Sequence, residues 1–593
     1  MSSFSHVNGV SMVDNEYLMQ TVLRQKFGFG DGMVVTDWGS ISNLEGADKW
    51  VKGQPACLTM KCAAQRAAKC LIAGTDQDLK GGYFGVGKLP TADQPLPTAL
   101  RLGYINESVV DKSVSRVLKV FFDVGRFSPA ADNPYRSIPF SAIGSPAHRK
   151  LARQAAAEAV VLLENAGDVL PLDAKRVRGL AVIGPAADAN YNASGYPFDT
   201  NPTDTLLQWC GDYSSCGSCP PNHTVSLAQG IRNHLKATGS SMPMVTTPGC
   251  AHNDSNTSGF AAALAMARRS DISHVILAVG LSGTLEGEGN DLLPSRFPVG
   301  LGLGLPGVQQ QLVDQISAVG KPTILLLVSG GSISVAPSAG ISATLHALYP
   351  GVEAGNGIAD VLFGAVSPAS RLPMSIPKHV SQLAYYLNFS MVAKPFGRTH
   401  AWLQGDGSEQ RHEYGAGLSY SRFRYHDLRV SLSSDNDVEI SCSVSNVGRG
   451  NGWQKPTDEV VMVFATWEVT DGGFSGRVPV RQLVAFARLR QIAAAETRTW
   501  SAKVPAKHFA LVNSDGDHVM PAGRVSFFVG GHQPTAASDK AAGTTCVNAT
   551  VEIKGARRAL KLDENASTVW NIVWTGGQSN SVGTNSQKSG CKK

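Results

Sequence analysis

Two short stretches of the chain place carboxylates where the backbone could hold them for chemistry. The first is Gly32–Gly39, in which the apolar run Met33–Val35 is followed by Thr36, Asp37 and Trp38. A short continuous apolar run is typical of a strand that is buried on both faces. In an α/β barrel, a polar residue just past the carboxyl end of a strand lies at the mouth, where chemistry takes place. Asp37 is therefore the first candidate catalytic residue, and the alternative is an aspartate that caps a helix after a core strand.

The second stretch is a glycine-rich loop that follows an apolar run ending at Val279. This loop contains three acids, Glu286, Glu288 and Asp291. Clustered acids could bind a cation, although the spacing differs from that of an EF-hand loop, and a merely solvated loop is the other alternative. Two carboxylates on either side of a bond are what hydrolysis of a glycoside needs, one to attack or stabilise and one to donate a proton. This chemistry predicts that one of the loop acids faces Asp37 across a cleft between two domains.

Residues 1–128 are expected to alternate between strands and helices. Apolar periodicity predicts one helix over Lys61–Ala73 and a second that Ser108 would cap and Gly125 would end. Residues 129–146 are rich in Pro, Ser and Ala, so we expect a linker there.

Residues 147–385 are predicted to form an α/β domain that begins with a long helix from Arg149 to Glu164. Apolar runs that alternate with helical stretches such as Val308–Ala318 are typical of a mostly parallel sheet. The expected strands are Leu180–Ile183, Val275–Val279, Ile324–Val328 and Thr344–Leu348. The first strand ends in Gly184-Pro185 without the glycine spacing of a dinucleotide-binding turn, which argues against an NAD-linked enzyme.

From about Phe423, apolar residues recur at every second position, which is typical of half-buried antiparallel strands. A connector over 386–425 would lead into a β-sandwich over 426–535. Its expected strands include Val438–Val444, Val460–Ala465, Leu483–Leu489, Thr497–Val504 and Val525–Val529. Residues 536–593 are rich in Ala, Ser, Thr and Lys and are expected to be a partly disordered tail.

The composition excludes several classes of protein. The 593 residues are 43% hydrophobic and 17% charged, which is globular composition with room for about three or four domains. The formal net charge of +6 is small for this length, and no dense run of Lys and Arg occurs, so nucleic acid is not an expected partner. No run of roughly 18 apolar residues occurs, so no membrane span is expected.

Ten cysteines and eight Asn-x-Ser/Thr sequons favour a secretory route. The sequons begin at Asn106, Asn192, Asn222, Asn253, Asn256, Asn388, Asn548 and Asn565. Cys210, Cys216 and Cys219 crowd one loop without the partners of a zinc site, so disulfides are expected there. Residues 1–30 have neither the basic start nor the apolar segment of a signal peptide.

The motifs of the chain, taken in order, resemble those of the family 3 glycoside hydrolases from residue 1 to about residue 535. Gly32–Gly39 is similar to the family's nucleophile motif, and residues 286–289 are similar to its acid/base loop. Further similar segments are Met1–Gly9, Gly74–Asp76, Leu305–Gln310, Pro350–Gly351, Ala359–Gly364, Arg371–Pro373, Gly397–Thr399 and Tyr414–Tyr420. The resemblance implies a multidomain α/β protein with part of a (β/α)8 TIM barrel, then an α/β sandwich domain, then a fibronectin type III-like β-sandwich.

The resemblance also implies roles for individual residues. Asp37 matches the nucleophile and Glu288 the acid/base, because the family's acid precedes the glycine of a Glu-Gly pair; Glu286 is the alternative. Trp38 would form a wall for the sugar ring, and its alternative role is core packing. The further candidates for binding substrate are Met1, Phe4 and Asp291. The implied reaction is a retaining, exo-acting hydrolysis of β-glucosyl or β-xylosyl residues of oligo- or polysaccharides, with no metal or organic cofactor.

Departures from the family's pattern leave alternatives open. Phe4 stands where the family has a tyrosine whose hydroxyl would steady the nucleophile, and Ser5 replaces an asparagine. Asp-Trp-Gly favours β-glucosidases, whereas Gly-Thr-Asp, Gly-Arg-Thr and Asp291 favour β-xylosidases, although Leu292 replaces the usual arginine. Met1 falls near the family's sixth barrel strand, which predicts a truncated chain whose leader is lost with the missing strands. The alternative function is a decayed, non-catalytic carbohydrate-binding or structural protein.

Overall fold

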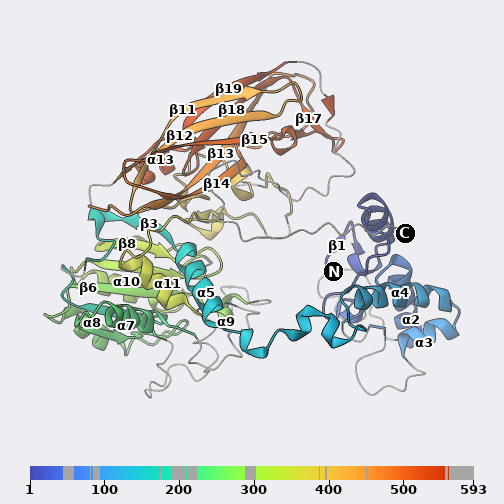
Figure 1. Ribbon diagram of the computed structural model, residues 1–593, viewed down its shortest axis with the longest axis horizontal. Coiled ribbons are helices and arrows are strands. Elements are labelled where there is room, and N and C mark those ends of the chain that lie inside the picture. The colour runs from blue at the N-terminus through green and yellow to red at the C-terminus, as the bar shows by residue number, and fades with distance from the viewer. Residues whose placement is uncertain are drawn as a thin grey trace. The chain divides into compact units, whose positions relative to one another are not determined.

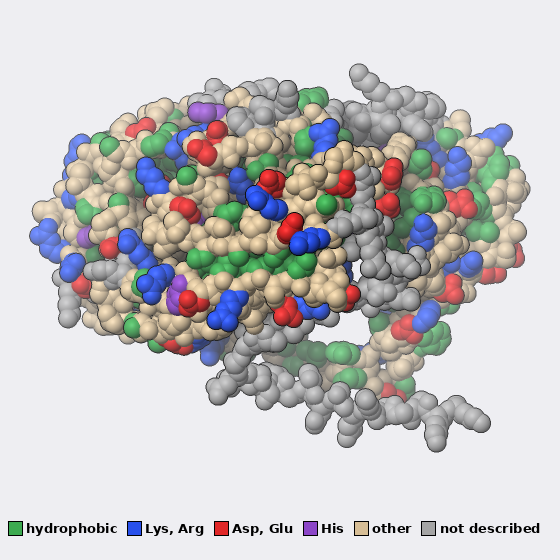
Figure 2. Space-filling model, turned by 90° about the horizontal axis from the view of Figure 1, so that it is seen from above, with side chains coloured by type: hydrophobic (Ala, Val, Ile, Leu, Met, Phe, Trp, Pro, Cys, Tyr) green, Lys and Arg blue, Asp and Glu red, His purple; other side chains and the backbone are tan. Residues whose placement is uncertain are grey.

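The computed structural model describes residues 1–43, 59–79, 82–83, 94–173, 176–188, 209, 211, 224–287, 302–385, 388–393, 397–448, 452–554 and 558–559. Within these ranges the chain divides into two compact units, one comprising Met1–Ala142 and the other beginning at Ile143 (Figure 1). None of the helices in these ranges is long and apolar enough to cross a membrane. Figure 2 shows Lys and Arg side chains mixed with Asp and Glu over one face, in keeping with the small net charge.

Three short parallel segments form the centre of the first unit. Ser2 forms a parallel bridge with Thr36, and Val35 forms one with Gln77, so the Val35–Thr36 segment lies between the other two. The Ser2 amide donates to the Val35 carbonyl at 2.8 Å, and the Thr36 amide donates to the Gln77 carbonyl at 2.9 Å. The strand predicted over Met33–Val35 is therefore present only as bridges at Val35 and Thr36.

A hairpin and several helices surround these segments. The hairpin pairs β1 (His6–Val7) with β2 (Val10–Ser11). The helices are η1 (Met12–Asp14), the π-helix η2 (Tyr17–Lys26), α1 (Ser40–Asn43), α2 (Met60–Ala73), α3 (Pro95–Arg101) and α4 (Glu107–Asp123). Residues 129–142, predicted to be a linker, contain the short turns η4 (Ala130–Asp132), η5 (Pro134–Ser137) and η6 (Phe140–Ala142).

The ends of α2 and α4 show how local sequence sets the helix boundaries. The Thr59 side chain accepts a hydrogen bond from the Cys62 amide, and Gly74 ends α2 with a left-handed φ of 102°, so the predicted helix is confirmed. The expected cap of α4 is wrong. Asn106 holds the extended conformation before the helix, and Ser108 lies in the first turn, where its hydroxyl donates to Asn106 Oδ1 at 2.7 Å.

The second unit starts with an α/β domain built on a six-stranded sheet of order β3-β8-β7-β6-β4-β5 (Figure 1). Its strands are β3 (Val161–Asn165), β4 (Leu180–Ile183), β5 (Met244–Thr247), β6 (His274–Gly280), β7 (Thr323–Val328) and β8 (Ile341–His346). Its main helices are α5 (Pro146–Ala159), α7 (Leu227–Ala237), α8 (Phe260–Arg268), α9 (Gly283–Glu286), α10 (Gln309–Ser317) and α11 (Ala354–Leu362). Neighbouring strands are parallel except for the edge strand β3.

The long helix predicted from Arg149 to Glu164 is wrong in its last turn. Helix α5 ends at Ala159, and β3 pairs antiparallel with β8. Four successive apolar residues, Val160–Leu163, are all buried, and the last three of them lie in β3. A continuous apolar run suits a strand covered on both faces, and the pairing partner lies far away in the sequence.

Both faces of the sheet are buried, which explains its uninterrupted apolar strands. In β6, Ile276 and Ala278 face a core with α7 and α11, whereas Val275, Leu277 and Val279 face a second core with α8 and α10. Side chains alternate between the faces of a strand, so one apolar run supplies both cores.

The chain then enters an antiparallel β-sandwich. One sheet has the order β11-β12-β15 and the other β14-β13-β18-β19. The strands are β11 (Arg422–Leu432), β12 (Val438–Gly448), β13 (Thr457–Val469), β14 (Gln482–Ile492), β15 (Thr497–Val504), β18 (Gly523–Gly530) and β19 (Val547–Ile553). Smaller elements are β9 (Ile376–Pro377), β10 (Gln410–His412), η12 (Ala506–His508), β16 (Leu511–Val512), β17 (His518–Met520) and α13 (Ala536–Ala542). The sandwich thus continues past residue 535, because β19 completes one of its sheets.

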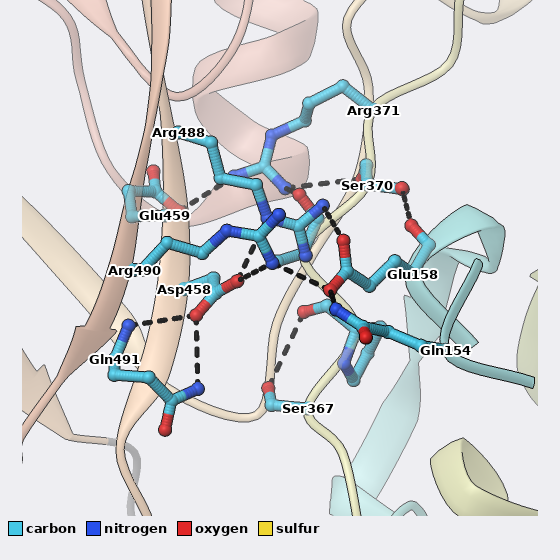
Figure 3. Close-up of polar contacts among 12 residues, drawn as sticks. Gln154, Glu158, Ser367, Ser370, Arg371, Asp458, Glu459, Arg488, Arg490 and Gln491 are labelled. Atoms are coloured by element: carbon cyan, nitrogen blue, oxygen red, sulfur yellow. Dashed lines mark hydrogen bonds and ion pairs between the residues drawn. The ribbon is translucent and has the colours of Figure 1, made fainter. Parts of the chain in front are cut away.

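Ion pairs join the α/β domain to the β-sandwich (Figure 3). Arg490 contacts Glu158 of α5 at 2.6 Å and Asp458 of β13 at 3.2 Å. Arg371 forms a buried pair with Glu459 at 2.8 Å. Charges removed from water need such partners, so these pairs fix how the two domains meet.

Candidate active site

Asp37 lies directly after the central parallel segment of the first unit. Its amide donates to the Ser2 carbonyl at 2.8 Å, which continues the ladder through the residue itself. Its carboxylate is half-buried, and Oδ1 accepts a hydrogen bond from the Trp38 amide at 2.6 Å. This amide lies outside α1, so the observed bond is not that of a helix cap. Asp37 thus directly follows a parallel segment, as expected of the candidate nucleophile, and its catalytic role stays a prediction.

A buried carboxylate, that of Asp76, anchors the segment that carries Asp37. Asp76 Oδ2 accepts a hydrogen bond from the Val34 amide at 2.8 Å. The same carboxylate receives Arg24 at 2.9 Å and Arg116 at 3.0 Å, and the Asp76 side chain is fully buried. The strand before the candidate nucleophile is therefore tied to η2 and α4 through charge-assisted hydrogen bonds.

Arg24 also closes the turn that precedes this segment. Its Nη1 donates to the carbonyls of Gly30 and Gly32, each at 2.7 Å, and its Nη2 donates to the carbonyl of Gly74 at 2.8 Å. Arg24 and Arg116 were missed in the sequence analysis. The signal that could have found them was an arginine in a helical stretch, which can pair with the acid at a strand end, Asp76.

The other candidates of the first unit lie at the surface. Met1 is 79% exposed, Phe4 is 44% exposed and Trp38 is 63% exposed. Trp38 is therefore no part of an apolar core, and an exposed indole beside a carboxylate offers a flat apolar face to a sugar ring. Contact of these three side chains with substrate stays a prediction.

Glu286 lies in α9, directly after β6, and its carboxylate is fully engaged. Its Oε1 accepts a hydrogen bond from the Gly330 amide at 2.5 Å, and its Oε2 accepts one from the Gly331 amide at 2.9 Å. Tyr349 donates its hydroxyl to Oε1 as well. Burial, reinforced by the hydrogen bond to Glu286, raises the pKa of the Tyr349 phenol, so this hydroxyl stays protonated as a donor. Glu286 thus joins the ends of β6, β7 and β8.

This environment fits Glu286 to a positioning role. Three donors already occupy the two oxygens of Glu286, whereas a general acid must present an oxygen to the leaving group. The predicted acid/base Glu288 and the predicted binding residue Asp291 lie outside the described residues. Their roles stay predictions, and the arrangement around Glu286 favours Glu288 as the proton donor.

A buried histidine supports the same edge of the sheet. His346 at the end of β8 contacts the Ser329 hydroxyl through Nε2 at 2.9 Å, and Ser329 donates to the Gly331 carbonyl at 2.8 Å. Burial lowers the pKa of His346 to about 4, so the imidazole is neutral near pH 7. Ser329, His346 and Tyr349 were missed from the sequence. Their signal was that all three are polar residues at or just past the carboxyl ends of parallel strands.

Comparison with known proteins covers all three parts of the chain. Residues 1–120 match the glycosyl hydrolase family 3 N terminal domain, residues 160–420 match the family 3 C-terminal domain, and residues 459–533 match a fibronectin type III-like domain. A probable exo-1,4-beta-xylosidase of Neosartorya fischeri is 30% identical over 555 residues. A beta-xylosidase of Formosa agariphila is 28% identical over 568 residues, which cover 93% of this chain and 69% of that protein.

Solved structures share the fold. One is an exo-beta-xylosidase in complex with a xylobiose aziridine activity-based probe, with a TM-score of 0.73 and 23% identity. The alignment covers 93% of this chain and 65% of the xylosidase chain. A second is a beta-glucosidase of Listeria innocua in complex with isofagomine, with a TM-score of 0.69 and 23% identity. That alignment covers 93% of this chain and 67% of the glucosidase chain. The alignment with the Neosartorya relative covers 89% of this chain, which spans 63% of that relative's length. The domain matches, in their order along the chain, confirm the predicted fold class and show that the chain belongs to glycoside hydrolase family 3.

Proposed function

We propose that this chain carries the catalytic residues of a retaining, exo-acting β-glycosidase. In this reaction Asp37 attacks the anomeric carbon and forms a covalent glycosyl-enzyme while Glu288 protonates the leaving oxygen. Glu288 then removes a proton from the water that releases the sugar. The observation that carries the proposal is the placement of Asp37, at the end of a parallel segment that the buried Asp76 carboxylate holds through the Val34 amide.

We also propose that terminal β-D-xylosyl residues are the preferred substrate. The supporting observation is that the curated relatives described above carry the names of β-xylosidases. Terminal β-D-glucosyl residues are the second candidate, because a structural neighbour is a β-glucosidase. The two sugars differ by one hydroxymethyl group, which a close-fitting pocket discriminates by about 1–3 kcal/mol.

Aryl glycosides test this function. Release of nitrophenol from aryl β-xylosides should exceed release from aryl β-glucosides, and Asp37→Asn should abolish both. Asp111→Asn is the matched control, because Asp111 is an exposed aspartate of α4 in the same unit. Activity that survives in Asp37→Asn would reject Asp37 as the nucleophile. A higher kcat/KM for glucosides would reject only the sugar preference.

We propose further that the protein follows the secretory route. Cys62 is disulfide-bonded, which suits an oxidising compartment. The sequon residues Asn106 and Asn388 are exposed and so accessible to glycosylation. Protein from a eukaryotic secretory host should lose mass on treatment with an N-glycosidase, and Asn106→Gln with Asn388→Gln should reduce this loss.

A further inference from the structure

Three side chains with metal-binding atoms meet at one end of the β-sandwich. His532 follows β18, Asp539 lies in α13 and Cys546 directly precedes β19. Their ligand atoms all lie within 4.8 Å of one another. His532 Nδ1 is 3.7 Å from Asp539 Oδ1 and 3.8 Å from Cys546 Sγ. The same nitrogen donates to the Gln533 carbonyl at 2.9 Å, a hydrogen bond that a metal on Nδ1 would replace.

The separations of His532 Nδ1 from Asp539 and Cys546 are too long for strong hydrogen bonds, which span about 2.7–3.2 Å between N and O. They suit atoms that share one cation. Zinc lies about 2.0–2.1 Å from imidazole nitrogen and about 2.3 Å from thiolate sulfur, so tetrahedral ligands lie roughly 3.3–3.6 Å apart. The two separations from His532 Nδ1 lie within a few tenths of an ångström of this spacing. The remaining pair, Asp539 and Cys546, lies within 4.8 Å and would close by up to roughly 1 Å on binding.

The surroundings of the cluster also suit a metal. Asp539 Oδ1 is buried and has no hydrogen-bond partner among the described residues, which is costly for a carboxylate oxygen. His532 is 4% exposed, and its other nitrogen, Nε2, lies 3.4 Å from the Thr544 hydroxyl. A histidine ligand commonly donates its second N–H to such an oxygen, which fixes the ring.

The backbone makes room for the sulfur. A Cβ atom on Gly530 would lie 2.4 Å from Cys546 Sγ, so glycine is required where the thiol packs on β18. The Cys546 thiol now donates to the His532 carbonyl at 3.4 Å. Its position therefore depends on both strands that flank the cluster.

We propose that His532, Asp539 and Cys546 form a zinc site of the β-sandwich, with water as the fourth ligand. One nitrogen, one oxygen and one sulfur donor suit Zn²⁺ better than the oxygen-seeking Ca²⁺ or Mg²⁺. Binding replaces the S–H bond of Cys546 with an S–Zn bond and releases the proton to solvent. The ion links β18, α13 and β19, so it stabilises the sheet edge at which β19 is added.

Equilibrium dialysis of the chelator-treated full chain against Zn²⁺ tests the site. We expect one zinc ion per chain and a higher melting temperature of the β-sandwich with zinc, because the ion binds only the folded domain. Co²⁺ in place of zinc should give a sulfur-to-metal charge-transfer band. Asp539→Asn and Cys546→Ser should each lower zinc affinity more than about 100-fold. Substitution of a residue that only hydrogen-bonds to a metal ligand already lowers metal affinity about 10–100-fold, and loss of the ligand itself should cost more.

Cys442→Ser is the matched control. Cys442 is a buried thiol of β12 in the same sandwich, and it donates to the His426 carbonyl at 3.3 Å, away from the cluster. This variant should bind zinc as the parent does. Absence of stoichiometric zinc, or zinc binding that is unchanged in both ligand variants, would overturn the proposal. If Cys546→Ser does not fold, Asp539→Asn decides, because it is nearly isosteric and its side chain is 32% exposed.

Discussion

At the scale of single residues, Asp76 shows how a buried charge can order a candidate active site. Its carboxylate is compensated by Arg24 and Arg116 and also holds the Val34 amide. A buried charge is tolerated when it is paired and hydrogen-bonded, and removal of one partner exposes the full cost of desolvation. The rigidity of this triad is what keeps Asp37 in place three residues further along the chain.

Asp76→Asn should destabilise the first unit by about 3–5 kcal/mol, because two buried guanidinium groups lose their counter-charge. Hydrogen exchange measures this locally, and the Val34 amide should exchange faster in the variant. Asp123→Asn is the control, since Asp123 pairs with Lys119 at 2.6 Å on the exposed surface of α4. Asp123→Asn should lower the free energy of unfolding by at most about 0.5 kcal/mol. Equal losses in both variants would contradict the anchoring role of Asp76.

Glu286 and Glu288 can be told apart by the leaving group of the substrate. A general acid matters most when the leaving group is poor, because it supplies the proton that such a group needs. Glu288→Gln should therefore retain activity on aryl glycosides whose phenol is acidic and lose activity on aryl glycosides whose phenol is weakly acidic. Glu286→Gln should lower kcat by a similar factor for all leaving groups, because an amide N–H would face the Gly330 or Gly331 amide and displace the loop. The measurement is the dependence of kcat/KM on the pKa of the phenol. If kcat/KM depended steeply on the pKa of the phenol in Glu286→Gln and not in Glu288→Gln, Glu286 would be the general acid.

At the scale of elements, the carboxyl ends of β6, β7 and β8 form one hydrogen-bonded edge. Glu286 joins the loop after β7 to Tyr349, and His346 supports that loop through Ser329. Gly280 ends β6 with a φ of 145°, and a Cβ there would lie 2.0 Å from the Val328 carbonyl oxygen. The close approach of β6 and β7 at this point thus requires glycine.

The buried histidines of this domain make its stability depend on pH. Burial lowers the pKa of His346 and of His252 from 6.5 to about 4. Below pH 6.5 the unfolded chain binds protons that the folded chain binds only near pH 4, so the free energy of unfolding falls as the pH falls between these values. Each histidine contributes about 3 kcal/mol to this loss.

Urea unfolding from pH 7 to pH 4.5 measures the effect. The midpoint should fall with pH, and His346→Gln should make the fall shallower because one group that titrates only on unfolding is gone. His148→Gln is the control, since His148 is exposed on α5. A slope that is the same in all three proteins would show that His346 is not buried in its neutral form.

At the scale of the whole molecule, the α/β domain and the β-sandwich are held together by charges that are buried where they meet. Arg371 reaches Glu459 at 2.8 Å and the Gly531 carbonyl at 2.7 Å, and Tyr425 donates to the other oxygen of Glu459 at 2.7 Å. The pairs of Arg488 and Arg490 with Asp458 and Glu158 surround this centre (Figure 3). The two domains should therefore unfold together.

Arg371→Met should separate their unfolding into two calorimetric transitions and cost about 3–5 kcal/mol, because Glu459 is left buried without a counter-charge. Glu459→Gln added to this variant should recover part of the loss. Arg524→Met is the control, since Arg524 pairs with Glu468 on the exposed face of the sandwich and should cost less than about 1 kcal/mol. A single transition in Arg371→Met would show that other contacts couple the domains.

The sequence alone determined the features that depend on neighbouring residues. The apolar run Leu180–Ile183 is found as β4, the alternating run Thr497–Val504 as β15, and Lys61–Ala73 within α2. Asp37 was chosen as a candidate because it directly follows an apolar run, and its catalytic role stays a prediction; the predictions of the three elements are confirmed. These predictions succeed because apolar periodicity records how an element is buried, whatever its partner.

Only the tertiary structure decided the features that depend on residues far apart in the chain. Residues near position 162 form β3 rather than the end of a helix because β8 offers a partner 180 residues later. Glu286 is held at the end of β6 because donors from Gly330 and Tyr349 converge on it. Asp76 is an anchor because η2 and α4 each bring it an arginine. A local pattern can place a charge at the end of a strand, but the fold determines which partners reach it and so whether it reacts or holds.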